Sequence, residues 1–318
     1  MTQRGRLTMR HFSIISILLL TLTASAQTHR DSWMAVLPDT MPVCKVSIPG
    51  THDSGTAGVR FPMRHYACTQ TMDLSEQWDA GIRFFDLRPR LEDGILRIYH
   101  GPADCHLGFG EALQIIKGKL EQHPTEFCVV MTNRAGGGPE GVDMTMDDIN
   151  TLFPDSMLAS FKADMTVADM RGRVLFINRD HPTGGREYPG TVVYGWPGNS
   201  SSHRARIVSS KESSAVLWAQ DYFTDDGKGN YTDSKWDKVA ALVREFASAP
   251  DGVWCINHLS GYTGSGVSTN IKRNAKTTNA RMLEYLSGHK KPIGIIPMDF
   301  PGQELIDVII FLNTFAVE

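Results

Sequence analysis

Short apolar runs recur along the chain and alternate with stretches whose apolar residues follow a helical period. The runs predict buried β-strands, and the intervening stretches, several of which stop before Pro or Gly, predict α-helices. The predicted strands are Val43–Ile48, Ile82–Leu87, Leu96–Tyr99, Phe127–Met131, Val174–Ile177, Ala215–Ala219, Val253–Ile256 and Ile293–Met298. The predicted helices are Asp73–Ala80, Gly110–Gln122, Lys235–Ser248, Asn279–Ser287 and Gln303–Phe315.

This alternation of about eight strands with helices favours parallel strands under an outer layer of helices. The predicted fold class is therefore α/β: a TIM-type (β/α)8 barrel, or a distorted or incompletely closed variant of it. Segments 136–161 and 180–210 are less regular and are expected to be insertions. An open doubly wound sheet is the structural alternative, but the sequence lacks the glycine fingerprint expected of a dinucleotide site in that fold.

Residues 1–26 have the pattern of a secretory signal peptide. Arg4, Arg6 and Arg10 give a positive start, segment 12–22 is apolar, and small residues at 24–26 suit cleavage. The apolar segment is short for a membrane span, and no second stretch of about 20 apolar residues follows. We therefore expect a mature chain that starts near Gln27, is secreted to an extracellular or periplasmic space, and forms one catalytic domain over 27–318.

The composition excludes some classes of protein and limits the disulfide chemistry. The formal net charge is −3, and Lys and Arg are scattered, so the sequence shows no basic surface of the kind that binds nucleic acid. The protein is expected to be a monomer. The five cysteines show no CxxC pattern and no zinc-type spacing. If any pair forms a disulfide, Cys68 with Cys105 is the expected one, because both lie in loop-like sequence.

Ionisable residues stand at the carboxyl ends of the predicted strands, where such barrels carry their chemistry. His52 and Asp53 follow the first run, Asp86 and Arg88 end the second, and His100 ends the third. Further strand ends carry Arg134, Arg179, Asp221 and Asp299. Each of these side chains alone could be an ordinary solvated residue or a helix cap, but together they predict one polar pocket on the barrel rim.

Two imidazoles and several arginines suit the cleavage of a phosphate diester. The two imidazoles can divide the roles of base and acid, and the guanidinium fork matches phosphate oxygens. A metal site is the rival, because His52, Asp53, Asp86 and His100 are all possible ligands. Arg88 argues against a metal, since it places a fixed positive charge on the face of Asp86, so no metal and no cofactor are expected.

Four stretches, Ser47–Thr56, Gly81–Arg90, Tyr99–Gly101 and Ile295–Phe300, resemble the catalytic X-type barrel of the bacterial phosphatidylinositol-specific phospholipases C. The likeness runs in order over nearly the whole mature chain. It implies cleavage of phosphatidylinositol, or a related inositol lipid, to diacylglycerol and a cyclic inositol phosphate.

The same resemblance implies a role for each catalytic residue. His52 would be the general base, oriented by Asp299, and Arg88 would bind the phosphate in place of a metal. His100, assisted by Asp53, would be the general acid. Asp86 would belong to the same polar network.

The substrate-binding side matches this family less well. Arg134 stands where the family commonly has lysine, whereas Arg179 and Asp221 fit positions that would bind ring hydroxyls. The family places a tyrosine two residues after the aspartate, but here Tyr222 and then Phe223 follow Asp221. The choice among phosphatidylinositol, a glycosylated inositol anchor and another lipid diester stays open.

A lipid substrate also implies transient contact with a membrane. Phe61, Met63, Tyr66 and the aromatic segment 194–197 could form an aromatic rim, although ordinary loop packing explains them equally well. Two other functions remain as alternatives: a metal-dependent glycerophosphodiester phosphodiesterase and a non-catalytic lipid-headgroup-binding protein.

Overall fold

The computed structural model describes residues 30–133, 138–182, 185–199, 203–209, 213–224, 231–264 and 270–316. The expected signal peptide and Arg134 lie outside these described residues.

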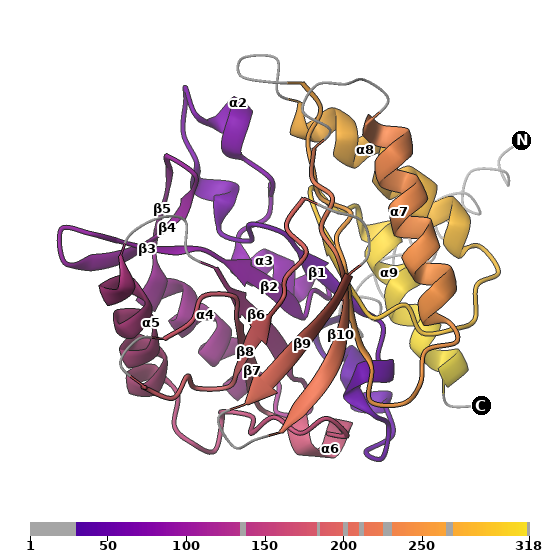
Figure 1. The fold of residues 1–318 in the computed structure, drawn as a ribbon, viewed down its shortest axis with the longest axis horizontal. Coiled ribbons are helices and arrows are strands. Elements are labelled where there is room, and N and C mark those ends of the chain that lie inside the picture. Colours follow the sequence, from indigo (N-terminus) through magenta and orange to yellow (C-terminus); the bar gives the residue numbers. More distant parts are fainter. Residues whose placement is uncertain are drawn as a thin grey trace, which may run out of the picture.

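The chain folds into a closed barrel whose strands run in the order β1-β12-β11-β10-β9-β8-β7-β6-β2 (Figure 1). The predicted α/β barrel is therefore confirmed, and over the described residues it is a closed barrel of nine strands. The barrel strands are β1 (Ile48–Thr51), β2 (Phe84–Leu87), β6 (Cys128–Thr132), β7 (Val174–Asn178), β8 (Thr191–Tyr194), β9 (His203–Ser209), β10 (Ser214–Gln220), β11 (Trp254–Asn257) and β12 (Ile295–Met298).

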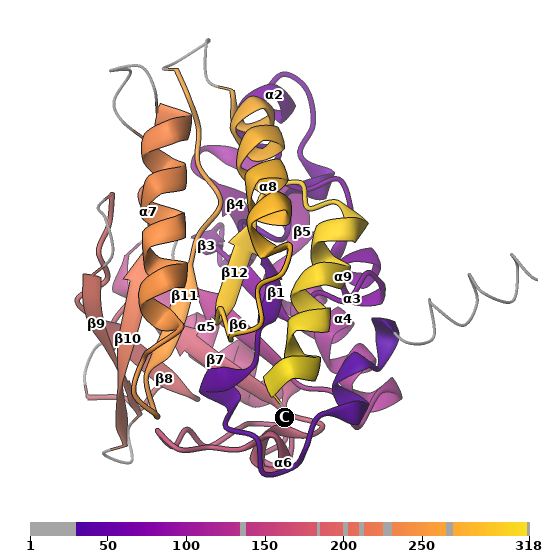
Figure 2. The same ribbon diagram turned by 90° about the vertical axis from the view of Figure 1, so that its right-hand side faces the viewer.

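Helices cover the outside of the barrel, and α7, α8 and α9 stand side by side on one flank (Figure 2). The α-helices are α2 (Arg64–Ala67), α3 (Leu74–Asp79), α4 (Phe109–Gln122), α5 (Pro139–Leu152), α6 (Val167–Met170), α7 (Tyr231–Phe246), α8 (Ile271–Leu286) and α9 (Gln303–Phe311). Short 3₁₀ turns are η1 (Trp33–Val36), η2 (Val43–Lys45), η3 (Thr56–Gly58) and η5 (Leu312–Ala316). None of the helices in the described ranges is both long and apolar enough to span a membrane.

Alternate residues of each barrel strand belong to different hydrophobic clusters. On β6, Val129 and Met131 pack with Phe84 and the other residues of one cluster, whereas Cys128 and Val130 pack with residues of the helix layer. Because side chains alternate across a strand, both faces of the sheet are apolar and buried. This explains why the strands read as continuous apolar runs in the sequence.

The first predicted strand is displaced along the chain. Val43–Lys45 forms the turn η2, and β1 starts at Ile48 and runs through Pro49 and Gly50. Pairing with β2 starts only at Gly50, so the missing N–H of Pro49 breaks no bond of that ladder. Gly50 is required where the strands meet, because a Cβ there would lie 2.8 Å from Phe84 Cδ1.

The third predicted strand is not part of the barrel. β4 (Ile95–His100) lies between β3 (Pro89–Glu92) and β5 (Ala103–Gly108) in a separate antiparallel sheet. Asp93 and Gly94 have positive φ angles of 49° and 76°, which is the backbone of a tight hairpin turn. This Asp-Gly turn reverses the chain, so His100 comes from a three-stranded sheet beside the barrel.

The two expected insertions contain regular structure, and the expectation of irregular segments is wrong. Segment 180–210 supplies β8 and β9, and β9 runs antiparallel to both of its neighbours. Segment 136–161 contains α5.

The cysteines are free, and all five are buried. Cys68 Sγ donates a hydrogen bond to the carbonyl of Gln70 (3.0 Å), and Cys105 Sγ donates one to the carbonyl of Ala103 (3.9 Å). The conditional pairing of Cys68 with Cys105 is therefore not formed in this structure, because each thiol behaves as a small buried group with a carbonyl partner.

Candidate active site

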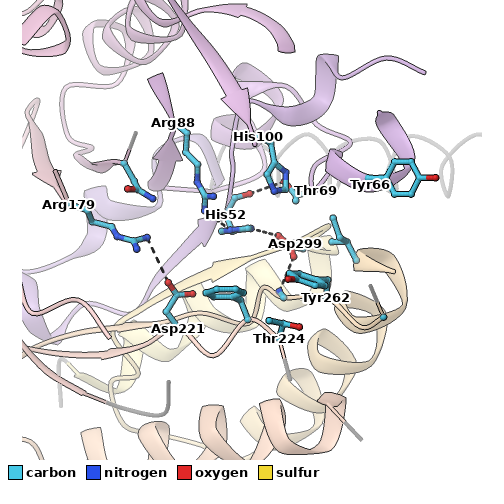
Figure 3. Close-up of a pocket in the computed structure, with 15 residues that line it drawn as sticks. His52, Tyr66, Thr69, Arg88, His100, Arg179, Asp221, Thr224, Tyr262 and Asp299 are labelled. Atoms are coloured by element: carbon cyan, nitrogen blue, oxygen red, sulfur yellow. Dashed lines mark hydrogen bonds and ion pairs between the residues drawn. The ribbon is translucent and has the colours of Figure 1, made fainter. Parts of the chain in front are cut away.

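A cavity of about 600 Å³ opens where the barrel strands end (Figure 3). It brings together most of the polar strand-end residues predicted from the sequence. Its lining is His52, Tyr66, Thr69, Arg88, His100, Asn133, Arg179, Asp221, Phe223, Thr224, Gly261, Tyr262, Gly264, Ile271 and Asp299.

His52 and Asp299 form the first pair in this cavity. β1 and β12 are parallel neighbours in which Thr51 lies opposite Met298, so the next residue of each strand faces the other. His52 Nδ1 lies 2.8 Å from Asp299 Oδ1, and Asp299 Oδ2 accepts a hydrogen bond from the Gly261 amide (3.2 Å). The register of two parallel strands therefore builds the imidazole–carboxylate pair.

Arg88 joins three groups of the site. Its Nε lies 2.7 Å from Asp53 Oδ1, and its Nη2 lies 3.1 Å from Asp86 Oδ2. The same Nη2 lies 2.8 Å from His52 Nε2. Because a guanidinium can only donate, Nε2 of His52 is the acceptor, and the proton of the neutral ring is on Nδ1, directed at Asp299.

The charges around His52 raise its proton affinity. Burial disfavours the imidazolium, but Asp53 and Asp299 outweigh burial and raise the pKa of His52 to about 9. Burial also opposes ionisation of Asp86, yet Arg88 and then His52 lower the pKa of Asp86 to about 2. Asp86 is therefore a fixed negative charge that holds Arg88, while His52 can take up a proton and keep it close to two carboxylates.

Asp53 lies between the two histidines. Its Oδ2 is 3.3 Å from His52 Nε2 and 3.4 Å from His100 Nε2. The other ring nitrogen of His100, Nδ1, donates to the carbonyl of Ala67 (2.8 Å). Asp53 has a φ angle of 46°, a left-handed conformation that Asp tolerates better than most residues and that often marks functional sites.

Arg179 and Asp221 form the opposite side of the cavity. Arg179 Nη1 lies 3.8 Å from Asp221 Oδ2, and the guanidinium carbon lies 4.2 Å from the centre of the Trp196 ring. Trp196 Nε1 donates to Asp221 Oδ2 (2.8 Å). Burial opposes ionisation of Asp221, but the Arg179 guanidinium and the hydrogen bond from Trp196 are among the groups that lower its pKa overall. This side therefore offers a cation and a carboxylate to a polar ligand.

Only one of the two aromatic residues after Asp221 lines the cavity. Phe223 contributes to the wall, whereas Tyr222 packs against Tyr231, with ring centres 5.4 Å apart, and against Lys238, whose Nζ lies 4.8 Å from the ring. The prediction that Tyr222 faces the substrate is therefore wrong. Successive residues of an extended segment point to opposite sides, so Tyr222 is directed towards α7.

Gln70 is a site residue that the sequence analysis missed. Its Nε2 donates to the carbonyls of His52 and Met298, both at 2.8 Å, and so bridges the ends of β1 and β12. Thr69 assists it, since its Oγ1 donates to the carbonyl of His52 (3.1 Å). No sequence signal marks two polar residues in a loop as partners of strands so distant in the chain.

His258 is a third imidazole beside His52. It is fully buried, and its ring centre lies 5.8 Å from those of His52 and Trp196. Burial lowers its pKa to about 3, so this ring stays neutral. A neutral ring fills the space between His52 and the Asp221 side without adding charge.

Three of the four residues suggested as metal ligands lie close together, and His100 does not belong to this group. Ligand atoms of His52, Asp53 and Asp86 all fall within 4.8 Å of one another. However, the Arg88 guanidinium pairs with the same two carboxylates, at 2.7 and 3.1 Å. The donor set is thus already neutralised by a protein cation, which fits a metal-independent site.

Comparisons with known proteins point in one direction. No protein-family model matches the chain. The chain is 25% identical over 296 residues to the 1-phosphatidylinositol phosphodiesterase of Listeria monocytogenes, covering 89% of this chain and 85% of that protein. It is also 25% identical over 286 residues to the protein of the same name from Staphylococcus aureus strain Newman, covering 86% of this chain and 88% of that protein.

Solved structures share the fold. The phosphatidylinositol-specific phospholipase C from Listeria monocytogenes superposes with a TM-score of 0.72 at 23% identity, covering 89% of this chain and 98% of that one. A variant of the Staphylococcus aureus phosphatidylinositol-specific phospholipase C gives a TM-score of 0.74 at 22% identity, covering 89% of this chain and 98% of that chain.

Proposed function

We propose that this chain, which belongs to the family of bacterial phosphatidylinositol-specific phospholipases C, cleaves phosphatidylinositol between its phosphate and diacylglycerol. The formal class is phosphatidylinositol diacylglycerol-lyase. The observation that carries the proposal is the position of Asp53 between two imidazoles: its Oδ2 lies 3.3 and 3.4 Å from the Nε2 atoms of His52 and His100. Arg88 lies beside this group, with its Nε 2.7 Å from Asp53 Oδ1 and its Nη2 2.8 Å from His52 Nε2. A site that only binds a headgroup does not need a base and an acid around one arginine.

In the first step His52 Nε2 accepts the proton of the inositol 2-hydroxyl while that oxygen attacks phosphorus. Arg88 covers this nitrogen at 2.8 Å in the structure, so the incoming phosphate must draw the guanidinium onto its own oxygens. The imidazolium that forms is stabilised by Asp299 and Asp53, at 2.8 and 3.3 Å.

In the same displacement the bond from phosphorus to the glycerol oxygen breaks. His100 must enter this step as the imidazolium, because its Nδ1 already donates a proton to the carbonyl of Ala67. Its Nε2 proton passes to the glycerol oxygen, which leaves as the hydroxyl of diacylglycerol, and His100 is left as the neutral imidazole. The other product is inositol 1,2-cyclic phosphate. Acid–base transfer typically contributes about 10²–10⁴-fold, so charge stabilisation by Arg88 must supply much of the remaining acceleration.

The opposite side of the cavity would bind the inositol ring. The Arg179 guanidinium and the Asp221 carboxylate can hydrogen-bond ring hydroxyls, and Phe223 offers an apolar face to the ring. Arg134, outside the described residues, remains a further predicted contact to the headgroup.

The site also has to reach its substrate at a membrane. Phe61 is 91% exposed, and Tyr66 lies at the outer edge of the cavity (Figure 3). These residues support transient insertion of an aromatic rim by a secreted, monomeric enzyme.

The direct test is incubation of purified mature protein with phosphatidylinositol vesicles, with and without excess chelator. We expect inositol 1,2-cyclic phosphate under both conditions. Activity lost with chelator would favour a metal-dependent glycerophosphodiester phosphodiesterase. Release of no product under either condition would favour a headgroup-binding protein.

A further inference from the structure

Lys235 is a fully buried lysine that the proposed catalytic steps do not use. It lies on α7, which packs against β10 and β11 on the outside of the barrel (Figure 2). Within the part of the chain that the structure describes, its ammonium forms no ion pair within 4.0 Å. Lysines are almost never fully buried without a charge partner, so its presence needs an explanation.

The hydrogen bonds of Lys235 lead to the strand ends that line the cavity. Its Nζ donates to Gln220 Oε1 (3.1 Å), and the same oxygen accepts the Tyr222 amide (2.7 Å). The side-chain amide of Gln220 donates to Asn257 Oδ1 (2.8 Å) and to the carbonyl of His258 (2.9 Å). Lys235 therefore connects α7 to the last residues of β10 and β11.

The turn that receives these bonds carries the residues that would bind the ring. Asp221 lies between Gln220 and Tyr222, and Phe223 follows directly. Tyr231, also on α7, holds the same turn by donating its hydroxyl hydrogen to the carbonyl of Tyr222 (2.8 Å). The N-terminal half of α7 thus sets the path of the backbone on both sides of Asp221.

The charge of Lys235 points to the same region. Burial lowers its pKa to about 7, while Asp221 and Asp299 oppose this fall. In return, Lys235 is among the groups that lower the pKa of Asp221. A partly charged ammonium therefore lies behind the wall that carries these two carboxylates.

Fold stability alone does not account for this residue. Removing an ammonium from water is costly, and no ion pair within 4.0 Å in the described part of the chain offsets that cost for Lys235. Methionine has a similar length and flexibility and would fill the same space. A residue that weakens the fold yet contacts the site is expected where function requires it.

We propose that Lys235 is a positioning residue for the inositol subsite: through Gln220 it holds the turn Gln220–Phe223 so that Asp221 and Phe223 face the ring. This inference rests on the proposed function and extends it to a residue outside the cavity.

The test compares wild type, Lys235→Met and the control Lys276→Met, which removes an exposed lysine from α8. The measurements are inhibition by myo-inositol, KM and kcat for phosphatidylinositol in detergent micelles, and Tm. For Lys235→Met we expect the inhibition constant and KM to rise at least about five-fold, kcat to change less than about two-fold, and Tm to stay equal or rise. Lys276→Met should match wild type throughout.

A second comparison shows whether Lys235 acts through the turn. In a Phe223→Ala background, adding Lys235→Met should weaken myo-inositol binding by less than about 1.5-fold, because both changes damage the same subsite. Full additivity would overturn the proposal, as would a Tm well below wild type or unchanged inhibition in Lys235→Met. If wild type cleaves phosphatidylinositol and Lys235→Met shows the same KM, kcat and inhibition constant, the inference about Lys235 is refuted while the proposed function stands. Wild type that neither cleaves the lipid nor binds myo-inositol refutes the proposed function with it.

Discussion

His52 and Asp299 are 247 residues apart in the chain, yet their side chains meet at 2.8 Å because β1 and β12 close the barrel side by side. The closure joins the first and last barrel strands, so this pair can form only when the whole barrel is assembled. The proposed base is therefore oriented by the pairing of two strands from opposite ends of the chain.

Replacing Asp299 with Asn should change both the rate and its pH dependence. His52 must be neutral to act as a base, so kcat/KM falls as the pH drops through its pKa, which Asp53 and Asp299 raise to about 9. Without the Asp299 charge this acidic limb should move to lower pH, while the maximal rate falls about 10²-fold through lost orientation. The pH–rate profile measures both effects.

The control for that variant is Asp251→Asn, which removes a carboxylate whose side chain is 95% exposed. It should keep the wild-type profile. An acidic limb that stays in place in Asp299→Asn would mean that Asp299 does not set the proton affinity of the base.

Arg88→Lys should lose about 10²–10³-fold in kcat/KM, although the charge is conserved. A lysine ammonium cannot contact Asp53, Asp86 and His52 at once as the guanidinium does at 2.7, 3.1 and 2.8 Å. Steady-state kinetics measure the loss, and Arg244→Lys, an exposed change on α7, should be neutral. Near wild-type activity of Arg88→Lys would show that the phosphate is held elsewhere.

Gln70→Ala should lower both stability and activity. It removes two hydrogen bonds at 2.8 Å and leaves the carbonyls of His52 and Met298 without that partner. The expected loss is about 2 kcal/mol in the free energy of unfolding, and kcat should fall about ten-fold because the strand ends no longer fix His52 against Asp299. Urea denaturation and kinetics measure the two effects.

Gln303→Ala is the matched control, because Gln303 donates two bonds at 2.9 Å to Ala80 and Asp307, groups that do not line the cavity. It should lose stability while kcat stays at the wild-type value. Equal falls in kcat for both variants would show that Gln70 has no specific effect on the base.

His258→Phe should make the fold less sensitive to acid. The pKa of His258 is about 3 in the folded protein, against about 6.5 for an unfolded histidine, so the unfolded state binds the proton first. Its stabilising effect is complete above pH 6.5 and is lost as the pH falls from 6.5 towards 3, by up to about 1.4 kcal/mol per pH unit. Urea denaturation at several pH values should show a shallower fall for the variant. An unchanged slope would mean that His258 titrates alike in both states.

The sequence predicts the parts of the site that follow from strand periodicity. Asp86, Arg88 and Asp299 lie where parallel strands end, and neighbouring strands of one barrel must bring such ends together. His100 reaches the cavity by another route, because the Asp-Gly turn at 93–94 directs its strand out of the barrel. That turn signal is present in the sequence, but the apolar run after it is indistinguishable from a barrel strand.

Other residues could not be assigned from sequence. Gln70 acts through the carbonyl of Met298, which lies 228 residues further along the chain. Lys235 acts through the side-chain amide of Gln220, 15 residues before it, across segments that follow no common period. Neither contact leaves a local pattern in the sequence. Either Tyr222 or Phe223 could face the cavity, depending on which side of the segment after β10 each side chain takes. The hydrogen bond from Tyr231 of α7 to the carbonyl of Tyr222 fixes that segment, and the sequence does not show this contact.

The separate hairpin sheet has a consequence for how this catalyst can diversify. The proposed base stands on the closed barrel, whereas the proposed acid stands on a sheet that begins at Pro89 and ends at Gly108, directly before α4. This sheet is one contiguous segment, but its histidine still depends on Asp53 at the end of β1 and on the carbonyl of Ala67. A change in the length of the segment would therefore move His100 relative to Asp53, while the strand register that joins His52 to Asp299 stays the same.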